Sequence, residues 1–189
     1  MDVKPEIFLD EIFEIEASGM LSDIMFSTFM MTLLMDFDES KHKAATNYII
    51  GILKECYKAG HLNVSIQHEG ETLYGFALFF IAPNHDATYL HKIFVYEQYR
   101  GHGIGTSILK SIITPENTVN LVCSGDKIDF YKRNGFHFVQ PFEIPENENF
   151  KLSKNLYTGL SVMTSSTDAL EAPIFFLNDN DLKIIAGIK

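Results

Sequence analysis

A glycine-rich segment, Arg-Gly-His-Gly-Ile-Gly-Thr at residues 100–106, constrains the fold of this chain more than any other feature. The residues before it, Tyr89 to Val95, are rich in aromatic and β-branched side chains and predict a strand. The residues after it carry apolar side chains at helical spacing and predict a helix. The glycines therefore fall at a strand-to-helix corner, where free backbone N–H groups and the helix dipole favour an anion such as a pyrophosphate.

Two common nucleotide-binding loops do not fit this segment. A Rossmann loop, Gly-x-Gly-x-x-Gly, would place its third glycine at Thr106. A P-loop needs a lysine directly after its last glycine, but Gly105 is followed by Thr106 and Ser107. The pattern that does fit is Arg-x-x-Gly-x-Gly, read at Arg100, Gly103 and Gly105. It resembles the coenzyme A signature of the Gcn5-related N-acetyltransferase (GNAT) superfamily.

A second segment supports the same resemblance. Residues 130–136 read Phe-Tyr-Lys-Arg-Asn-Gly-Phe and resemble the GNAT element Phe-Tyr-x-x-x-Gly-Phe. We expect a short buried strand ending near Val122, then a helix from about Gly125 to Asn134 that stops at Gly135. The two elements span residues 89–139 in the family's order. Over residues 89–136 the chain is also similar to diamine (spermidine/spermine) acetyltransferases, which carry a glutamate where His91 stands.

The expected fold class is α/β (α+β): a single-domain GNAT fold with a mixed central β-sheet, splayed central strands and flanking helices. The domain would span residues 1–189, with a core of about 12–165 and an accessory C-terminal segment, 166–189. An apolar stripe predicts a helix from an N-cap at Ser40 to near Gly60. Strands are predicted at 62–68 and 73–81, joined by a turn at 69–71, and at 89–95. The last core strand is predicted at 156–163.

Three parts of the chain are less well determined by their sequence. The first 17 residues fit a helix or a strand, and the family resemblance implies a strand. Residues 20–37 are apolar, but Asp23 and Asp36 leave too short a stretch for a membrane span, so a buried or partner-facing helix is the better interpretation. The accessory segment is apolar at several positions and is interpreted as an apolar accessory piece: residues 174–177, Leu182, Ile184 and Ile185.

Charge and cysteine content narrow the class of protein. The chain has 189 residues and a formal net charge of −10, which argues against binding along a nucleic-acid backbone. Its two cysteines, Cys56 and Cys123, form no metal-ligand pair. The start of the chain does not resemble a secretory signal. We therefore expect a cytoplasmic protein with no nucleic-acid or membrane partner.

The family resemblance implies acetyl-coenzyme A as co-substrate and no metal. In GNATs the glycine loop binds the pyrophosphate through its N–H groups, and the preceding strand pairs with the pantetheine arm. N–H groups near Phe94 and Val95 would polarise the thioester oxygen. Ser124 stands where many GNATs have an asparagine that contacts the arm, and Lys127 replaces a common alanine. The expected cofactor-binding residues are Ile93, Phe94, Val95, Arg100, Gly101, His102, Gly103, Ile104, Gly105, Thr106 and Ser124.

Two residues are the expected catalytic groups. Tyr131 stands where many GNATs have a tyrosine that protonates the departing thiolate, and a phenol with a reference pKa of about 10 is protonated at neutral pH. His91 is the candidate base, because strand alternation would place it on the face of Tyr89, Ile93 and Val95 and its reference pKa is about 6.5. Glu97 or a chain of waters competes for that role. A covalent route through Cys123 is the less favoured alternative to direct transfer.

The resemblance thus predicts an acetyl-CoA-dependent N-acetyltransferase that acts on a primary amine of a small molecule or a protein. Two alternatives remain open. One is a non-catalytic acyl-CoA-binding sensor, and the other is a toxin-like GNAT that acetylates aminoacyl-tRNA or a protein. Many GNATs are dimers, so a homodimer is possible.

Overall fold

The computed structural model describes residues 5–27, 37–144, 148–167, 172 and 174–187. The chain forms two compact units. Unit 1 consists of Met1–Leu9, Cys56–Phe142 and Gly159–Phe175. Unit 2 consists of Asp10–Glu55, Glu143–Thr158 and Phe176–Lys189.

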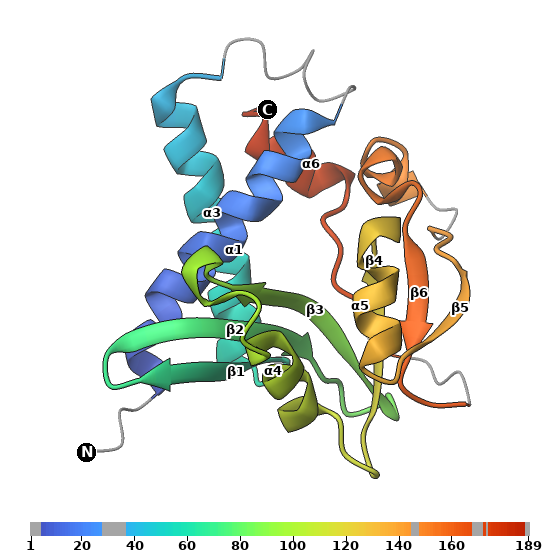
Figure 1. Ribbon diagram of the computed structural model, residues 1–189. Coiled ribbons are helices and arrows are strands. Elements are labelled where there is room, and N and C mark those ends of the chain that lie inside the picture. The colour runs from blue at the N-terminus through green and yellow to red at the C-terminus, as the bar shows by residue number, and fades with distance from the viewer. Residues whose placement is uncertain (1–4, 28–36, 145–147, 168–171, 173, 188–189) are drawn as a thin grey trace. The chain divides into compact units, whose positions relative to one another are not determined.

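Unit 1 is built on a six-stranded mixed sheet of order β1-β2-β3-β4-β6-β5 (Figure 1). Four of its five strand pairs are antiparallel, and only β3 and β4 run parallel. A parallel pair needs a crossover connection, and α4 supplies it between these two strands. The strands are β1 (Leu62–Glu69), β2 (Thr72–Phe80), β3 (Ala87–Val95), β4 (Thr118–Cys123), β5 (His137–Pro141) and β6 (Ser161–Thr164).

Two helices of unit 1 pack against this sheet. Helix α4 (Ile104–Ile112) lies on β1, β2 and β3, and α5 (Ile128–Arg133), preceded by the 3-10 turn η3 (Gly125–Lys127), contacts β5. The apolar stripe of α4 faces a core cluster that includes Ala77, Leu90 and Leu121. The mixed sheet with flanking helices confirms the expected fold class, and the predicted strands, hairpin turn and helices between residues 62 and 136 are confirmed within one to three residues at each end.

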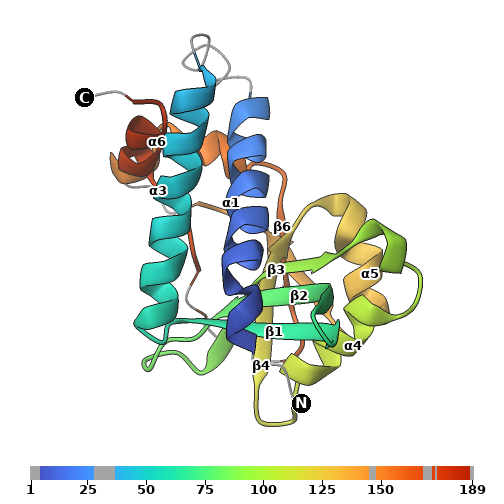
Figure 2. The same cartoon turned by 90° about the vertical axis from the view of Figure 1, so that its left-hand side faces the viewer.

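Unit 2 contains all but the ends of α1 (Leu9–Phe26) and α3 (Glu39–Lys58), which lie side by side (Figure 2). Lys54 near the end of α3 forms an ion pair of 2.7 Å with Asp10 at the start of α1, so the two helices run antiparallel. The strand that the family resemblance implied for the N-terminus is wrong. Pro5–Phe8 is a 3-10 turn and α1 follows, because the buried side chains recur at helical spacing: Ile12, Phe13, Glu16, Ala17, Leu21 and Ile24.

The start of α3 also differs from the prediction. The helix begins at Glu39, so Ser40 lies inside its first turn. The carboxylate of Asp38 accepts a hydrogen bond of 2.9 Å from the N–H of Lys41, which makes Asp38 the capping residue. Half of the apolar stretch at 20–37, residues 28–36, falls outside the described residues, and the part before it includes the end of α1.

The end of the chain adds α6 (Asp179–Ile185) to unit 2. Leu182 and Ile185 of α6 are buried together with Leu177, as expected for a packed accessory piece. The predicted strand at 156–163 is mostly wrong: residues Ser153–Tyr157 form the 3-10 turn η5, and β6 begins only at Ser161. Tyr157 is held in unit 2 instead, because its hydroxyl accepts a hydrogen bond of 2.9 Å from the N–H of Leu177.

Candidate functional site

The two central strands of the sheet separate partway along their length. Strand β3 pairs with β4 only from Ala87 to Leu90, opposite Thr118 to Leu121. On its other side β3 stays paired with β2 as far as Val95. The edge of β3 that faces β4 therefore lies beyond this pairing from His91 to Val95, and we call this stretch the open edge. This divergence of β3 from β4 is the splay that the family resemblance implied.

A β-bulge lies where the splay begins. Phe79 pairs with Leu90 and Leu78 pairs with Lys92, so His91 is the extra residue. The expected alternation is therefore wrong past this point: His91 shares a face with Tyr89, but not with Ile93 and Val95. Those two side chains pack instead with the core cluster beneath α4.

The glycine-rich segment forms the corner that its pattern predicts. Gly101 and Gly103 have φ angles of 82° and 78°. Gly103 is the N-cap of α4 and places no side chain over the first turn, so the N–H groups at the start of α4 are not covered by a capping side chain. Only a residue without Cβ adopts this conformation at little cost. The corner can therefore hold an anion close to its backbone.

Arg100 has a role that its charge alone did not predict. Its Nε donates a hydrogen bond of 3.0 Å to the carbonyl oxygen of Val95. His102 makes a similar contact, 3.3 Å from its Nδ1 to the carbonyl oxygen of Tyr99. Both side chains therefore fold the loop back onto the backbone that precedes it.

Two glycines allow close approaches around this corner. A Cβ on Gly75 of β2 would lie 2.6 Å from the carbonyl oxygen of Phe94, which is closer than real Cβ contacts allow. A Cβ on Gly105 would lie 3.3 Å from the ring of Phe130. Gly75 was not predicted as part of the site, although a glycine inside a strand is a sequence signal for close backbone approach.

Tyr131 lies on α5 and is half-buried. Its ring meets those of Phe130 and Phe136 edge-on, at centroid distances of 5.1 and 5.5 Å. Burial, and to a lesser extent the nearby Cys123 thiol, raises the pKa of Tyr131 above its ordinary value. The hydroxyl is therefore protonated and able to donate at neutral pH.

The end of α5 fixes where Tyr131 sits. The N–H of Phe136 donates to the carbonyl of Tyr131 at 3.1 Å, and the N–H of Gly135 donates to that of Lys132 at 3.1 Å. With Gly135 at a φ of 88°, this is a Schellman motif. The Gly-Phe part of the second sequence element is thus a helix stop.

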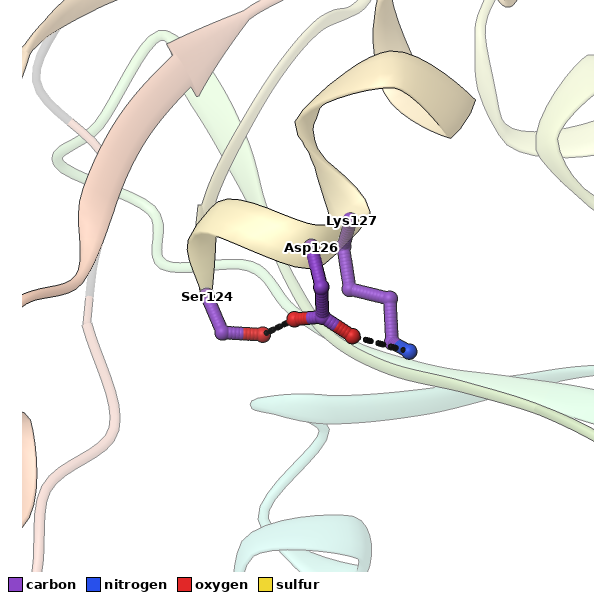
Figure 3. A network of polar contacts seen from close by, with 3 residues as sticks. All are labelled: Ser124, Asp126 and Lys127. Atoms are coloured by element: carbon purple, nitrogen blue, oxygen red, sulfur yellow. Dashed lines mark hydrogen bonds and ion pairs between the residues drawn. The ribbon is translucent and has the colours of Figure 1, made fainter.

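Ser124 follows β4 and begins a short polar network (Figure 3). Its hydroxyl donates to the Asp126 carboxylate, which also pairs with the Lys127 ammonium at 2.7 Å. The hydrogen bonds from Lys127 and Ser124 lower the pKa of Asp126. All three residues are exposed. The Ser124 proton is therefore already engaged, and toward a ligand this hydroxyl is an acceptor.

Cys123, the last residue of β4, is buried in the core. Its thiol lies 3.7 Å from the sulfur of Met163, and burial, with a smaller contribution from Asp126, raises its pKa. A thiolate nucleophile needs the opposite shift. Cys123 therefore behaves as a core residue.

All of the predicted site residues lie in unit 1. Ile93, Val95, Ile104 and Tyr131 pack toward the core cluster on the α4 face. His91 lies on the other face, where its ring meets those of Phe80, Tyr89 and Phe175. The two candidate catalytic groups therefore lie on opposite faces of the sheet.

Neither a metal-binding cluster nor a membrane-spanning helix occurs among the described residues. No group of three or more His, Cys, Asp or Glu side chains suited to a metal occurs among the residues that the structure describes. Within the same residues, no helix is long and apolar enough to span a membrane.

Comparison with known proteins agrees with this geometry. Residues 60–138, from just before β1 into β5, match the family model of the acetyltransferase (GNAT) domain. No curated protein matches the chain in sequence. The matched residues include both sequence elements that resemble this family, the glycine-rich segment and the Phe-Tyr-x-x-x-Gly-Phe element.

Solved structures share the fold. An acetyltransferase from Corynebacterium glutamicum, described as histone acetyltransferase HPA2 and related acetyltransferase, superposes with a TM-score of 0.59 at 14% identity, over 88% of this chain and 94% of that one. An N-acetyltransferase from Staphylococcus aureus superposes with a TM-score of 0.56 at 16% identity, over 85% of this chain and 96% of that one. At such identities the likeness concerns the fold alone.

Proposed function

We propose that the protein transfers an acetyl group from acetyl-coenzyme A directly to a primary amine of a small molecule or a protein. The observation that carries this proposal is the splay: the pairing of β3 with β4 ends at Leu90, and β3 continues to Val95, before the loop that begins α4. A strand that diverges from its neighbour and is followed by an anion-binding corner fits a long amide-bearing arm that ends in phosphates.

The donor side would be held mainly by backbone. The N–H groups of Gly101, Gly103 and Gly105 would bind the pyrophosphate, helped by the dipole of α4. Arg100 adds positive charge there, and its hydrogen bond to Val95 keeps the end of β3 and the loop in one arrangement. Ser124 would accept a hydrogen bond from the cofactor arm, since its own proton goes to Asp126.

Acetyl transfer forms a bond between the amine nitrogen and the carbonyl carbon and breaks the bond from that carbon to sulfur. N–H groups near Phe94 and Val95 would stabilise the negative charge that develops on the carbonyl oxygen. The direct route is favoured because the buried Cys123 has a raised pKa, so its thiol stays neutral.

Tyr131 would serve the leaving sulfur. Its raised pKa lies above the reference value of about 8.5 for a thiol, so complete proton transfer to a thiolate is uphill. The hydroxyl instead stabilises the departing thiolate by a hydrogen bond, and the proton released by the amine completes the thiol.

His91 would accept the proton that the ammonium loses before it attacks, whereas the proton that completes the thiol is the second one, released from nitrogen as the amide forms. An alkyl ammonium has a reference pKa of about 10.4 and must become neutral before it attacks, whereas imidazole accepts a proton near pH 7. His91 is half-buried and lies at the start of the open edge. We retain His91 as base in preference to Glu97, which is exposed on the turn η2 (Glu97–Tyr99).

The decisive experiment measures release of free thiol from acetyl-coenzyme A across polyamines, aminoglycosides, amino acids and peptides. We expect turnover with at least one amine class. Replacing Tyr131 with Phe should lower kcat by about a hundredfold and leave the Kd for acetyl-coenzyme A unchanged.

Tyr157→Phe is the matched control, because Tyr157 is a tyrosine of unit 2 bonded to Leu177. It should change stability and leave kcat unaffected. Binding of acetyl-coenzyme A with no thiol release across the whole panel would replace the proposal by a cofactor-binding sensor, and absence of binding would overturn it.

A further inference from the structure

A cluster of aromatic rings surrounds His91 on the face of the sheet opposite α4. The imidazole centroid lies 5.7 Å from that of Phe80 and 5.3 Å from that of Phe175, at interplanar angles of 86° and 78°. Tyr89 adds a third ring at 6.1 Å. The imidazole is thus enclosed on several sides by large, rigid side chains, with both phenylalanines nearly perpendicular to it.

Phe175 is the member of this cluster that comes from far along the chain. It stacks on Phe80 with a centroid distance of 5.0 Å and an interplanar angle of 9°. Phe80 ends β2, and residue 175 is the last residue of unit 1, in the accessory segment. The match to the GNAT domain ends at residue 138, so the family pattern does not supply this ring.

The bulge explains why His91 needs such support. At a regular strand position, pairing on the neighbouring strand sets the direction of each side chain. His91 is the extra residue between two paired positions and lies on the stretch of β3 that has already left β4. The rings that pack against the imidazole therefore contribute to its direction, and Phe175 together with Phe80 supplies that packing.

We propose that Phe175 is a positioning residue: it fixes the imidazole of His91 at the open edge of β3, so that the accessory segment completes the acceptor side of the site. This inference rests on the proposed function, in which His91 accepts the proton of the amine. It assigns a part in catalysis to a segment that carries no catalytic motif. Fixing a reacting group is worth large factors in rate, because a misplacement of about 1 Å can cost about a hundredfold.

The test compares substitutions at two neighbouring positions. Phe175→Ala removes the ring, Phe175→Tyr keeps it, and Ile174→Ala is the matched control because Ile174 is 38% exposed and has no ring to contribute. For Phe175→Ala we expect kcat to fall by roughly ten- to a hundredfold while the Kd for acetyl-coenzyme A stays within twofold of wild type. Phe175→Tyr and Ile174→Ala should retain wild-type kcat.

A spectroscopic readout separates this inference from the proposed function. Ring resonances of His91 in ¹³C- and ¹⁵N-labelled protein, assigned with the variant His91→Gln, should shift toward those of a solvent-exposed histidine in Phe175→Ala and stay unchanged in Ile174→Ala. If the wild-type protein acetylates no amine, the proposed function fails, while these spectra still test the placement of His91. Unchanged resonances, or an unchanged kcat in Phe175→Ala, would overturn the inference.

Should Phe175→Ala unfold, Phe175→Leu keeps the apolar volume without the ring and replaces it in both measurements. A folded Phe175→Leu with wild-type kcat and unshifted His91 resonances would refute the role of the ring equally well. A loss of acetyl-coenzyme A binding equal to the loss of kcat would also refute it, because it would place Phe175 on the donor side.

Discussion

The loop at residues 100–106 and the contact between η5 and α6 show two ways of fixing a piece of chain. The loop is shaped by backbone conformation: glycines at positive φ turn it, and α4 starts from one of them. In unit 2 the hydrogen bonds of a side chain, and not the backbone conformation, hold the chain in place. The buried carboxylate of Asp179 accepts hydrogen bonds of 2.9 to 3.0 Å from the N–H groups of Leu152 and Ser153 and from the Ser153 hydroxyl.

This difference decides what a change of sequence can do in each region. A shape made by glycine is lost when a Cβ is added, whatever the chemistry of the new side chain. A shape made by a carboxylate tolerates neighbouring changes but depends on its charge, and hence on pH. The glycine-built region leaves its N–H groups to a ligand, whereas the carboxylate-built region uses them internally.

The largest loss of stability is expected at a glycine where there is no room for a Cβ atom. In Gly75→Ala the added Cβ would press on the Phe94 carbonyl, forcing β2 and β3 apart at the splay. We expect the free energy of unfolding to fall by about 3 kcal/mol and binding of acetyl-coenzyme A to be lost. Chemical denaturation and calorimetric titration measure both quantities.

Gly51→Ala is the control for this prediction. Gly51 lies inside α3 with open space around its Cα, so alanine should raise the free energy of unfolding by about 0.5 to 1 kcal/mol. A stable Gly75→Ala with wild-type cofactor affinity would show that β2 and β3 do not need their close approach.

The second effect tests the carboxylate-built region. Burial alone would raise the pKa of Asp179, but the hydrogen bonds from Ser153 and Leu152 outweigh burial and lower it. A lowered pKa means that this carboxylate stabilises the fold above the unfolded-state value of about 3.9, and that the stabilisation is lost as pH falls below it. We expect Asp179→Asn to cost about 2 kcal/mol at pH 7 and progressively less below pH 4.

Urea denaturation of wild type and Asp179→Asn between pH 3 and pH 7 checks this dependence. A penalty independent of pH would mean that shape, and not charge, carries the contact.

The same contrast explains what the sequence could and could not predict. The glycine corner, α4, the Schellman stop at Gly135 and the strands around them follow from local patterns, because each depends on residues a few positions apart. Two other contacts join residues far apart in sequence, and no local pattern predicts them. They are the contacts of Asp179 with Leu152 and Ser153 and the stacking of Phe175 on Phe80. The bulge at His91 is of the same kind, because it is defined only by the register with β2.

A smaller loss of stability is expected at a glycine that has a positive φ but open space around it. A Cβ on Gly103 would meet nothing within 4 Å, but its φ of 78° is costly for any other residue. We expect Gly103→Ala to lower the free energy of unfolding by about 1 kcal/mol and to weaken binding of acetyl-coenzyme A severalfold.

Gly125→Ala is the matched variant, since that glycine also has open space and no positive φ. It should leave the free energy of unfolding and the cofactor affinity near wild type. Equal behaviour of the two variants would exclude backbone strain as the reason for glycine at position 103.

The smallest effect should come from the exposed network that begins at Ser124. Asp126 has a lowered pKa like Asp179, but its carboxylate is open to solvent, where ion pairs with lysine are screened and contribute little. Asp126→Ala should leave Tm unchanged at 150 mM salt. The same variant removes the acceptor of the Ser124 hydroxyl proton. Because Ser124 accepts a hydrogen bond from the cofactor in the proposed function, the Kd for acetyl-coenzyme A should change by less than about threefold. A clear gain in affinity would show instead that Ser124 donates to the cofactor once Asp126 releases it, and that this acid restrains the donor side.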